Sequence, residues 1–425
     1  MKGELRRIKS INRYEAKTLL ISILVGALVA PLAMSLPVVI NALFDLASRI
    51  TDLPGGSIWL IVPLIIAGLA VGLLTRKIAP EAEGSGLHVA AAAFNTEGSR
   101  LRARTVPFKY LATVITTGAG STTGVVSPSA LIGYSLGSSI AYRLKLEPDR
   151  VRTIGLCGLA AAISALLETP LGAAVFAVEI AYRNRILYRR FFYCLASSIV
   201  AFLISIVLRP NKPFLDIPGD IPSLTVVDLL TMIFIALAVT ILCILYIWSY
   251  QYFHNRFIRM NWKGYGWLKP AFGFLLAGSF IIPVFTILKD LGYIGGYSGN
   301  LLPFEDLNIS RMALVAVVLF ITTALIAGSG NSGGLFMPIM TFGAIFGVAI
   351  ASLFTDTAPV VFAAVGMTAA IATTLNVPLA AVVICAELFG LPAFLPAILG
   401  SLTGYFIGKR YVIYHEIKWS KLKAQ

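Results

Sequence analysis

The chain has 425 residues, of which 58% are hydrophobic and only 13% are charged, and its formal net charge is +14. Ordinary soluble domains have an apolar share nearer to half, so this composition excludes that class and predicts a polytopic membrane protein in a lipid bilayer. We attribute the basic excess to cytoplasmic loops and expect no nucleic-acid partner, because the positive-inside rule alone produces such an imbalance.

Apolar runs long enough to span a bilayer predict a series of helices in the order of the chain. They cover residues 12–46, 58–78, 191–208, 226–248, 270–288 and 312–326. Residues 338–407 are also apolar, but glycine and proline interrupt them repeatedly. The first run is too long for a cleavable signal peptide, so we expect it to remain as a membrane helix.

Basic residues concentrate in five segments, which are residues 1–9, 100–104, 183–190, 254–263 and 409–423. Because Lys and Arg accumulate in cytoplasmic loops, we expect these segments and both termini to be cytoplasmic. The loops around Asp52 and residues 216–220 and 305–306 are poorer in Lys and Arg and are expected outside. The localisation that follows is the plasma membrane.

Two Gly/Pro-bounded breaks interrupt very apolar sequence at residues 124–137 and 334–347. Both follow one pattern: Gly, three residues, Pro, four residues, Gly, three residues, Gly. Proline is tolerated in the first turn of a helix, so each break predicts a helix that begins near Pro128 or Pro338.

The second half of the chain repeats the first. Residues 158–180 align without gaps on residues 366–388 at an offset of 208, and ten of the 23 aligned pairs are identical. We therefore divide the chain into an N-terminal cytoplasmic segment (1–12), a first membrane repeat (13–208), a second membrane repeat (209–408) and a cytoplasmic tail (409–425). We expect no paired nucleotide-binding modules in the tail.

Interrupted hydrophobic segments at matching positions of two repeats point to a midplane substrate site. A helix that begins inside the membrane exposes its first amides and the positive end of its dipole, and two such ends can hold an anion without Lys or Arg. The alternative is that both breaks are only kinks with glycine packing faces, since glycines four residues apart also mark helix packing.

A family resemblance appears when Gly-Ser-Gly at residues 84–86, Lys109, the two breaks and Tyr414 are taken together. The chain then resembles the CLC family of chloride channels and chloride/proton exchangers over about residues 13–417, most specifically at residues 334–338. The resemblance implies an all-α polytopic membrane fold of two inverted-topology repeats with tilted, broken helices. It also implies a homodimer with a pore in each subunit.

The same resemblance implies which residues bind chloride and similar small anions. They are Ser85, Gly86, Val125, Val126, Ser127, Leu335, Phe336 and Tyr414. Tyr414 requires a short insertion after Lys409, so Tyr411 remains an alternative for the phenol. Bound chloride ions are the only ligands implied; no metal, organic cofactor or enzymatic activity is expected.

Two departures from the family pattern decide the expected mechanism. Val126 stands at the position of the gating glutamate, and Ile180 stands at that of the glutamate through which exchangers take up protons from inside. Without these carboxylates we expect passive chloride transport that is uncoupled from protons. The alternative is a weakly coupled chloride/proton antiporter that uses another protonatable group, such as His88 or Glu179.

Three further interpretations remain open. An intramembrane hydrolase with Ser85 or Ser127 as nucleophile would need a nearby histidine base. Glu179 and Glu387 are intramembrane carboxylates, which suggests function, but their repeat symmetry favours a structural role in accepting hydrogen bonds from amides at a helix end. Glu168, whose repeat counterpart is Asn376, has no explanation from the sequence.

Overall fold

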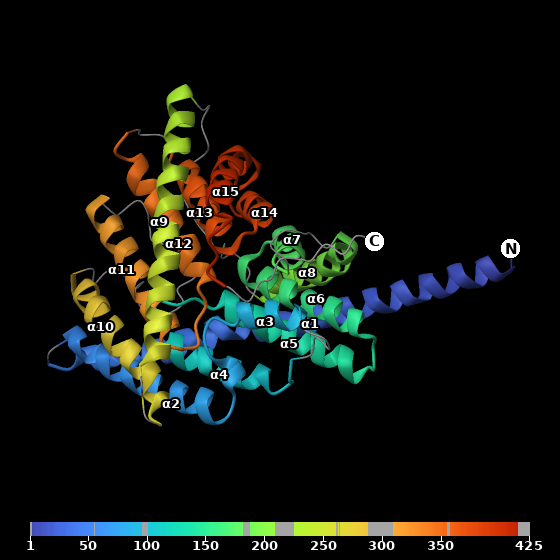
Figure 1. The fold of residues 1–425 in the computed structure, drawn as a ribbon, viewed down its shortest axis with the longest axis horizontal. Helices are drawn as coiled ribbons and strands as arrows, with labels where there is room; N and C mark the ends of the chain where they lie inside the picture. Colours follow the sequence, from blue (N-terminus) through green and yellow to red (C-terminus); the bar gives the residue numbers. More distant parts are fainter. Residues whose placement is uncertain are drawn as a thin grey trace.

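The computed structural model describes residues 2–54, 56–95, 101–181, 188–208, 225–260, 262, 264–287, 309–354 and 358–414. Side chains are described from residue 15 onward, except those of residues 285–287 and 309. The loops predicted outside at residues 216–220 and 305–306, and tail residues 415–425, lie beyond the described part. Within it the chain is helical, and two halves of the molecule pack side by side (Figure 1).

The described residues of the first half form eight α-helices, with short 3₁₀ turns between the early ones. They are α1 (Lys2–Ser48), η1 (Arg49–Asp52), η2 (Gly56–Leu60), α2 (Ile61–Lys77), η3 (Pro80–Ala82), α3 (Leu87–Asn95), α4 (Thr105–Gly118), α5 (Val126–Arg143), α6 (Pro148–Leu167), α7 (Pro170–Glu179) and α8 (Tyr188–Leu208).

In the second half, the part of the chain that the structure describes forms seven α-helices in a related order. They are α9 (Val226–Arg259), η4 (Gly266–Leu268), α10 (Lys269–Ile287), α11 (Ile309–Gly328), α12 (Phe336–Ala351), α13 (Pro359–Leu375), α14 (Pro378–Phe389), η5 (Leu391–Ala393) and α15 (Phe394–Gly408).

The predicted membrane helices are confirmed, with differences in length. The described residues hold eight helices long and apolar enough to cross a membrane, including α1, α2, α8, α9, α10 and α11. Helix α1 begins at Lys2 rather than at residue 12, because residues 2–11 are rich in strong helix formers such as Glu, Leu, Arg and Lys. Helix α7 has ten residues and spans only about half of a bilayer.

The repeat predicted from the sequence is present in the backbone. Residues 119–126 and 329–336 adopt the same succession of turn, bridge and helix start, with Gly120 at φ +103° and Gly330 at φ +94°. Glu168 and Asn376 both end a helix in the left-handed conformation at φ 60°. The two positions therefore share one backbone conformation, which suits asparagine, and the structure does not explain why residue 168 is a glutamate.

Glu179 and Glu387 each cap the start of a helix in the other repeat. Glu179, at the end of α7, accepts hydrogen bonds from the amides of Leu379 (3.1 Å) and Ala380 (2.8 Å) in the first turn of α14. Glu387, near the end of α14, accepts them from the amides of Leu171 (2.9 Å) and Gly172 (2.7 Å) in α7. The predicted structural role is confirmed, and each carboxylate satisfies amides that α7 or α14 cannot satisfy alone.

The glycines that follow each break pack helix against helix. A Cβ atom on Gly133 would lie 2.1 Å from the Gly158 carbonyl oxygen, so α5 and α6 touch through their backbones. The same holds in the second repeat, where a Cβ on Gly343 would lie 2.7 Å from the Gly366 carbonyl oxygen. Packing glycines therefore accompany the breaks, as the alternative interpretation predicted, but they lie within the helices that the breaks begin.

We predict that Glu179→Ala destabilises the protein more than Glu387→Ala does. Glu179 is buried and Glu387 is only half-buried, and each buried amide left without an acceptor costs about 1–3 kcal/mol. Thermal unfolding of the purified variants in detergent, followed by tryptophan fluorescence, measures the difference. Asp45→Ala, at an exposed carboxylate on α1, is the control; a Glu179→Ala protein that melts with the parent would contradict the reciprocal capping.

Candidate anion-binding site

The two breaks meet at a pair of backbone hydrogen bonds. The Gly124 amide donates to the Gly334 carbonyl at 2.8 Å, and the Gly334 amide donates to the Gly124 carbonyl at 2.6 Å. A Cβ atom on Gly124 would lie 2.7 Å from the Met337 Cβ, and one on Gly334 would lie 2.8 Å from the Gly124 carbonyl oxygen. Glycine is required at both positions, because any side chain would push the two loops apart.

Directly after this bridge, two helices begin in the interior without side-chain caps. The N-cap residues are Val125 for α5 and Leu335 for α12, and neither makes a side-chain capping bond. Both residues, together with Val126, Ser127 and Phe336, are at most 1% exposed. The first amides of a helix have no acceptor in that helix, and they carry the positive end of its dipole. Two such ends beside each other form an electropositive site built from backbone alone.

The predicted residues of the two repeats approach each other at Ser127 and Phe336. The Phe336 amide donates a long hydrogen bond of 3.4 Å to the Ser127 hydroxyl. Phe176 of α7 packs its ring edge to face against Phe336, with centroids 5.3 Å apart. Phe176 could not be found from the repeat, because its counterpart at the offset of 208 is Ile384.

A second group of predicted residues forms around Ser85 and Tyr414. Their hydroxyl oxygens lie 2.6 Å apart in a direct hydrogen bond, and both side chains are buried. The His88 ring stacks on the Tyr414 ring at 5.5 Å. Tyr411 lies elsewhere, with its ring against Trp248. Of the two tyrosines that the sequence left open, Tyr414 is therefore the one beside Ser85.

The loop that carries Ser85 is held by a buried lysine. The Lys109 ammonium of α4 donates to the carbonyl oxygens of Ala82 (3.0 Å) and Gly84 (2.5 Å). A Cβ atom on Gly86 would lie 3.0 Å from the Lys109 Cε and 3.1 Å from the Leu131 Cβ of α5. Gly86 thus joins the Ser85 loop to the helix that begins at the first break.

The two positions without carboxylates are enclosed by protein. Val126 and Ile180 are 1% and 2% exposed, and the neighbouring Glu179 carboxylate is directed to the amides of α14. For the hydrolase interpretation, the Ser85 hydroxyl is bonded to Tyr414 and the Ser127 hydroxyl to the Phe336 amide. Neither serine has a histidine partner among the described residues, so the arrangement does not favour a nucleophile.

Comparison with known proteins gives one consistent result. A family model described as "Voltage gated chloride channel" matches residues 67–409. An uncharacterized protein, MJ0305, of Methanocaldococcus jannaschii is 26% identical over 363 residues, which cover 85% of this chain and 88% of that protein. The H(+)/Cl(-) exchange transporter ClcA of Vibrio cholerae is 28% identical over 353 residues, which cover 78% of this chain and 72% of that protein.

Solved structures agree with the sequence relatives. A slow cyanobacterial Cl-/H+ antiporter matches with a TM-score of 0.78 at 21% identity, over 93% of this chain and 96% of that one. A CLC-type fluoride/proton antiporter matches with a TM-score of 0.79 at 20% identity, over 96% of this chain and 99% of that one. At these identities the likeness shows a shared fold of inverted helical repeats.

We predict that Gly124→Ala and Gly334→Ala each destabilise the protein and lower anion efflux from liposomes. The added methyl group must displace backbone or packed side chains at the bridge, which typically costs about 1–3 kcal/mol. Melting temperature and efflux are measured together. Asp45→Ala, at an exposed carboxylate on α1, is again the control; normal stability and flux in both bridge variants would mean that the bridge does not hold the site.

Proposed function

The chain belongs to the voltage-gated chloride channel family, and from this premise we propose that it conducts chloride passively and without proton coupling, through a pore in each subunit. The observation that carries the proposal is the pair of uncapped, buried helix starts at Val126 and Phe336, which are joined by the Gly124–Gly334 bridge. The chloride ion is held by backbone amides at Val125, Val126, Ser127, Leu335 and Phe336.

The Ser85–Tyr414 pair forms the inner end of this path. Both hydroxyls can donate a hydrogen bond to an anion, and they bond to each other in the structure. Gly86 supports this end through its close packing on Lys109 and Leu131. An ion that passes here replaces the hydroxyl–hydroxyl bond by its own bonds to the same groups. The pair acts as a constriction that opens for the ion.

The absence of coupling follows from the side chains of Val126 and Ile180. A carboxylate that enters an anion site competes with chloride when ionised and leaves on protonation, which ties the movement of one ion to that of the other. Valine has no proton to exchange, and Ile180 supplies no acceptor near the end of α7. Glu179 does not replace it, because both of its oxygens accept bonds from α14 amides. Chloride then moves down its own gradient.

The alternative is a weakly coupled chloride/proton antiporter with a non-standard protonatable group. The names of the relatives favour it, since ClcA of Vibrio cholerae is a H(+)/Cl(-) exchange transporter. His88 is the group best placed for such a role, because its ring stacks on Tyr414 at the inner end. The uncoupled mechanism is preferred, since no carboxylate lies at the gate position.

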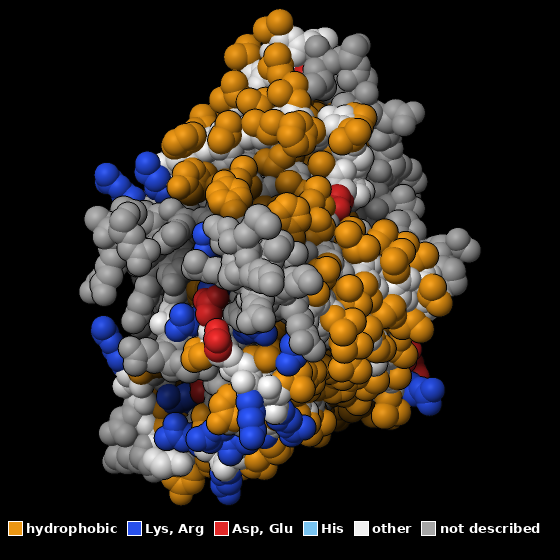
Figure 2. Space-filling view, turned by 90° about the vertical axis from the view of Figure 1, so that its right-hand side faces the viewer, with side chains coloured by type: hydrophobic (Ala, Val, Ile, Leu, Met, Phe, Trp, Pro, Cys, Tyr) orange, Lys and Arg blue, Asp and Glu red, His pale blue; other side chains and the backbone are white. Residues whose placement is uncertain are grey.

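We further propose a homodimer in the plasma membrane with both termini cytoplasmic. The side of the molecule that carries α7, α8, α14 and α15 presents a broad apolar surface (Figure 2). Large exposed side chains on these helices include Leu171, Phe192, Leu203, Leu379, Phe394 and Leu402. This surface suits a second copy of the chain as well as lipid. The orientation rests on the basic segments, by the positive-inside rule.

We predict that a chloride gradient across liposomes containing the protein drives no proton flux. Chloride efflux should persist when valinomycin and potassium shunt the membrane potential, since the ion needs no counter-transported proton. A pH electrode and a chloride electrode record both ions in one experiment, and ClcA in the same lipids is the positive control. Uphill proton movement driven by chloride would establish the antiporter instead.

We predict that Val126→Glu slows efflux at neutral pH and that acidification relieves the block. The new carboxylate would lie at the helix N-terminus and compete with chloride while ionised, which we expect to slow efflux about tenfold. Val126→Gln has the same shape but no charge to titrate, so it should keep the pH profile of the parent. Equal pH profiles of the two variants would place residue 126 outside the anion path.

A further inference from the structure

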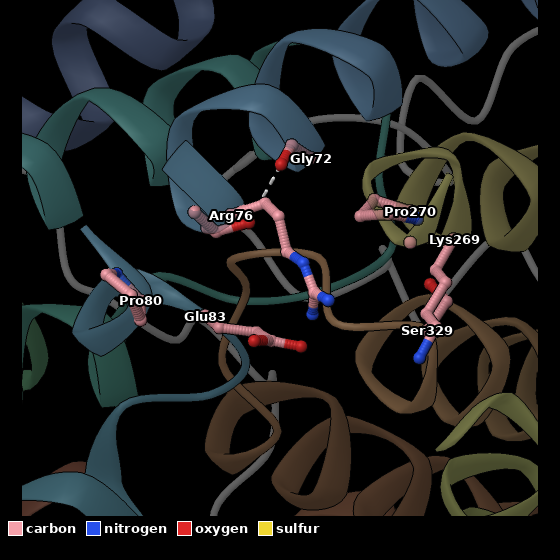
Figure 3. A pocket seen from close by; sticks show the side chains of 9 residues that line it. Gly72, Arg76, Pro80, Glu83, Lys269, Pro270 and Ser329 are labelled. Carbon is pink, nitrogen blue, oxygen red and sulfur yellow. Dashed lines mark hydrogen bonds between the residues drawn. The ribbon is translucent and has the colours of Figure 1, made fainter. Parts of the chain in front are cut away.

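A cavity of about 200 Å³ lies behind the loop that carries Ser85. Its wall combines the end of α2, the 83–86 loop, the start of α10 and the loop after α11, and it includes Thr75, Arg76, Glu83, Lys269 and Ser329. Figure 3 shows the charged ends of Arg76 and Glu83 projecting into the same space, with Lys269 facing them from α10. Three charged groups from three elements thus share one cavity.

The position of Glu83 is fixed on both sides by backbone contacts. Lys109 bonds to the carbonyl oxygens of Ala82 and Gly84, the residues that flank it. The Gly84 amide donates to the Gly330 carbonyl, and a Cβ atom on Gly330 would lie 2.6 Å from a Glu83 carboxylate oxygen. The carboxylate therefore lies against the loop that leads to the second break and is two residues from Ser85.

The charges in the cavity are close but not directly paired. Within the described part of the chain, neither Arg76 nor Lys269 forms an ion pair with Glu83. Loss of surrounding water raises the pKa of the Glu83 carboxyl above its ordinary value of 4.5, against the attraction of Lys269, His254, Arg76 and Lys109, which lowers it. Protonation of Glu83 would leave both cations of the cavity without a neighbouring negative charge.

We propose that this cavity is a cytoplasmic binding site for the transported anion, in which Arg76 and Lys269 hold the anion and ionised Glu83 competes with it. The inference rests on the proposed passive chloride conduction and on the proposed orientation. Access of chloride to the Ser85–Tyr414 constriction then increases when Glu83 is protonated.

The mixture of charges favours a small monovalent anion over a phosphate group. A phosphate or a phosphorylated lipid headgroup carries more negative charge and would be repelled by the Glu83 carboxylate at neutral pH. Chloride can share the cavity with a protonated Glu83 and leave when the carboxylate ionises. Sequence reasoning does not single out Glu83, because an acidic residue before Gly-Ser-Gly is typical of an ordinary loop.

The test is chloride efflux from liposomes at equal pH on both sides, scanned from about pH 4.5 to about pH 8. In the parent, efflux should rise as pH falls through the pKa of Glu83. Removing one charge beside a bound anion near a protein surface should change the rate about three- to tenfold. Glu83→Gln should be fast at every pH, and Arg76→Gln or Lys269→Gln should lower the rate at acidic pH.

The matched control is Glu81→Gln, a nearby carboxylate outside the cavity that pairs with Arg104 at 2.9 Å and should keep the parental profile. A parent without pH dependence, or an unchanged profile in Glu83→Gln, would overturn the inference. The inference would also be overturned if His88→Gln or His254→Gln alone abolished the pH dependence of efflux. It would likewise be overturned if the efflux rate followed the anionic lipid content of the liposomes but not the charges of Arg76 and Lys269. Proton flux recorded in parallel tests the proposed function separately.

Discussion

The backbone bridge between Gly124 and Gly334 is the constraint on which the site depends. Non-helical backbone inside a bilayer must be buried in protein and must satisfy its polar groups there. Here each break satisfies the other, because the two glycines exchange amide–carbonyl bonds. The first amides of a helix have no acceptor within that helix, and the Phe336 amide donates to the Ser127 hydroxyl across the bridge. The matching positions of the two breaks in the repeats thus allow this pairing and place the two helix starts of the candidate site beside each other.

The same exchange occurs a second time, at α7 and α14. Glu179 and Glu387 each accept hydrogen bonds from the first amides of a helix in the other repeat. These carboxylates neutralise helix ends that would otherwise attract anions. Among the described residues, no carboxylate accepts a hydrogen bond from the first amides of α5 or α12. The starts of α7 and α14 are therefore capped by carboxylates, whereas those of α5 and α12 have no side-chain cap.

The sequence was informative where the chain repeats itself and uninformative where distant segments meet. Composition predicts the membrane helices, the paired Gly/Pro pattern predicts both breaks, and the repeat symmetry of Glu179 and Glu387 predicts their structural role. The contact between Ser85 and Tyr414 joins residues 329 positions apart, so it came only through the family resemblance. Phe176 and Glu83 were not found, because packing against Phe336 and placement in a cavity leave no periodic signal in the sequence.

The proposed mechanism separates binding from gating. Backbone amides cannot titrate, so the site at the bridge keeps its affinity for anions at every physiological pH. Val126 adds no charge to this site, so the rate of transport must be controlled by access to the site rather than by the site itself.

On the inner side the path narrows to the Ser85 and Tyr414 hydroxyls, which are hydrogen-bonded to each other. An incoming ion opens this constriction when it accepts hydrogen bonds from both hydroxyls in place of the bond between them. A negative charge close to that constriction would lower the local chloride concentration, which makes the charge state of the surrounding loop the remaining variable. In a pathway without a gating carboxylate, the electrostatics of the entrance would therefore set the rate.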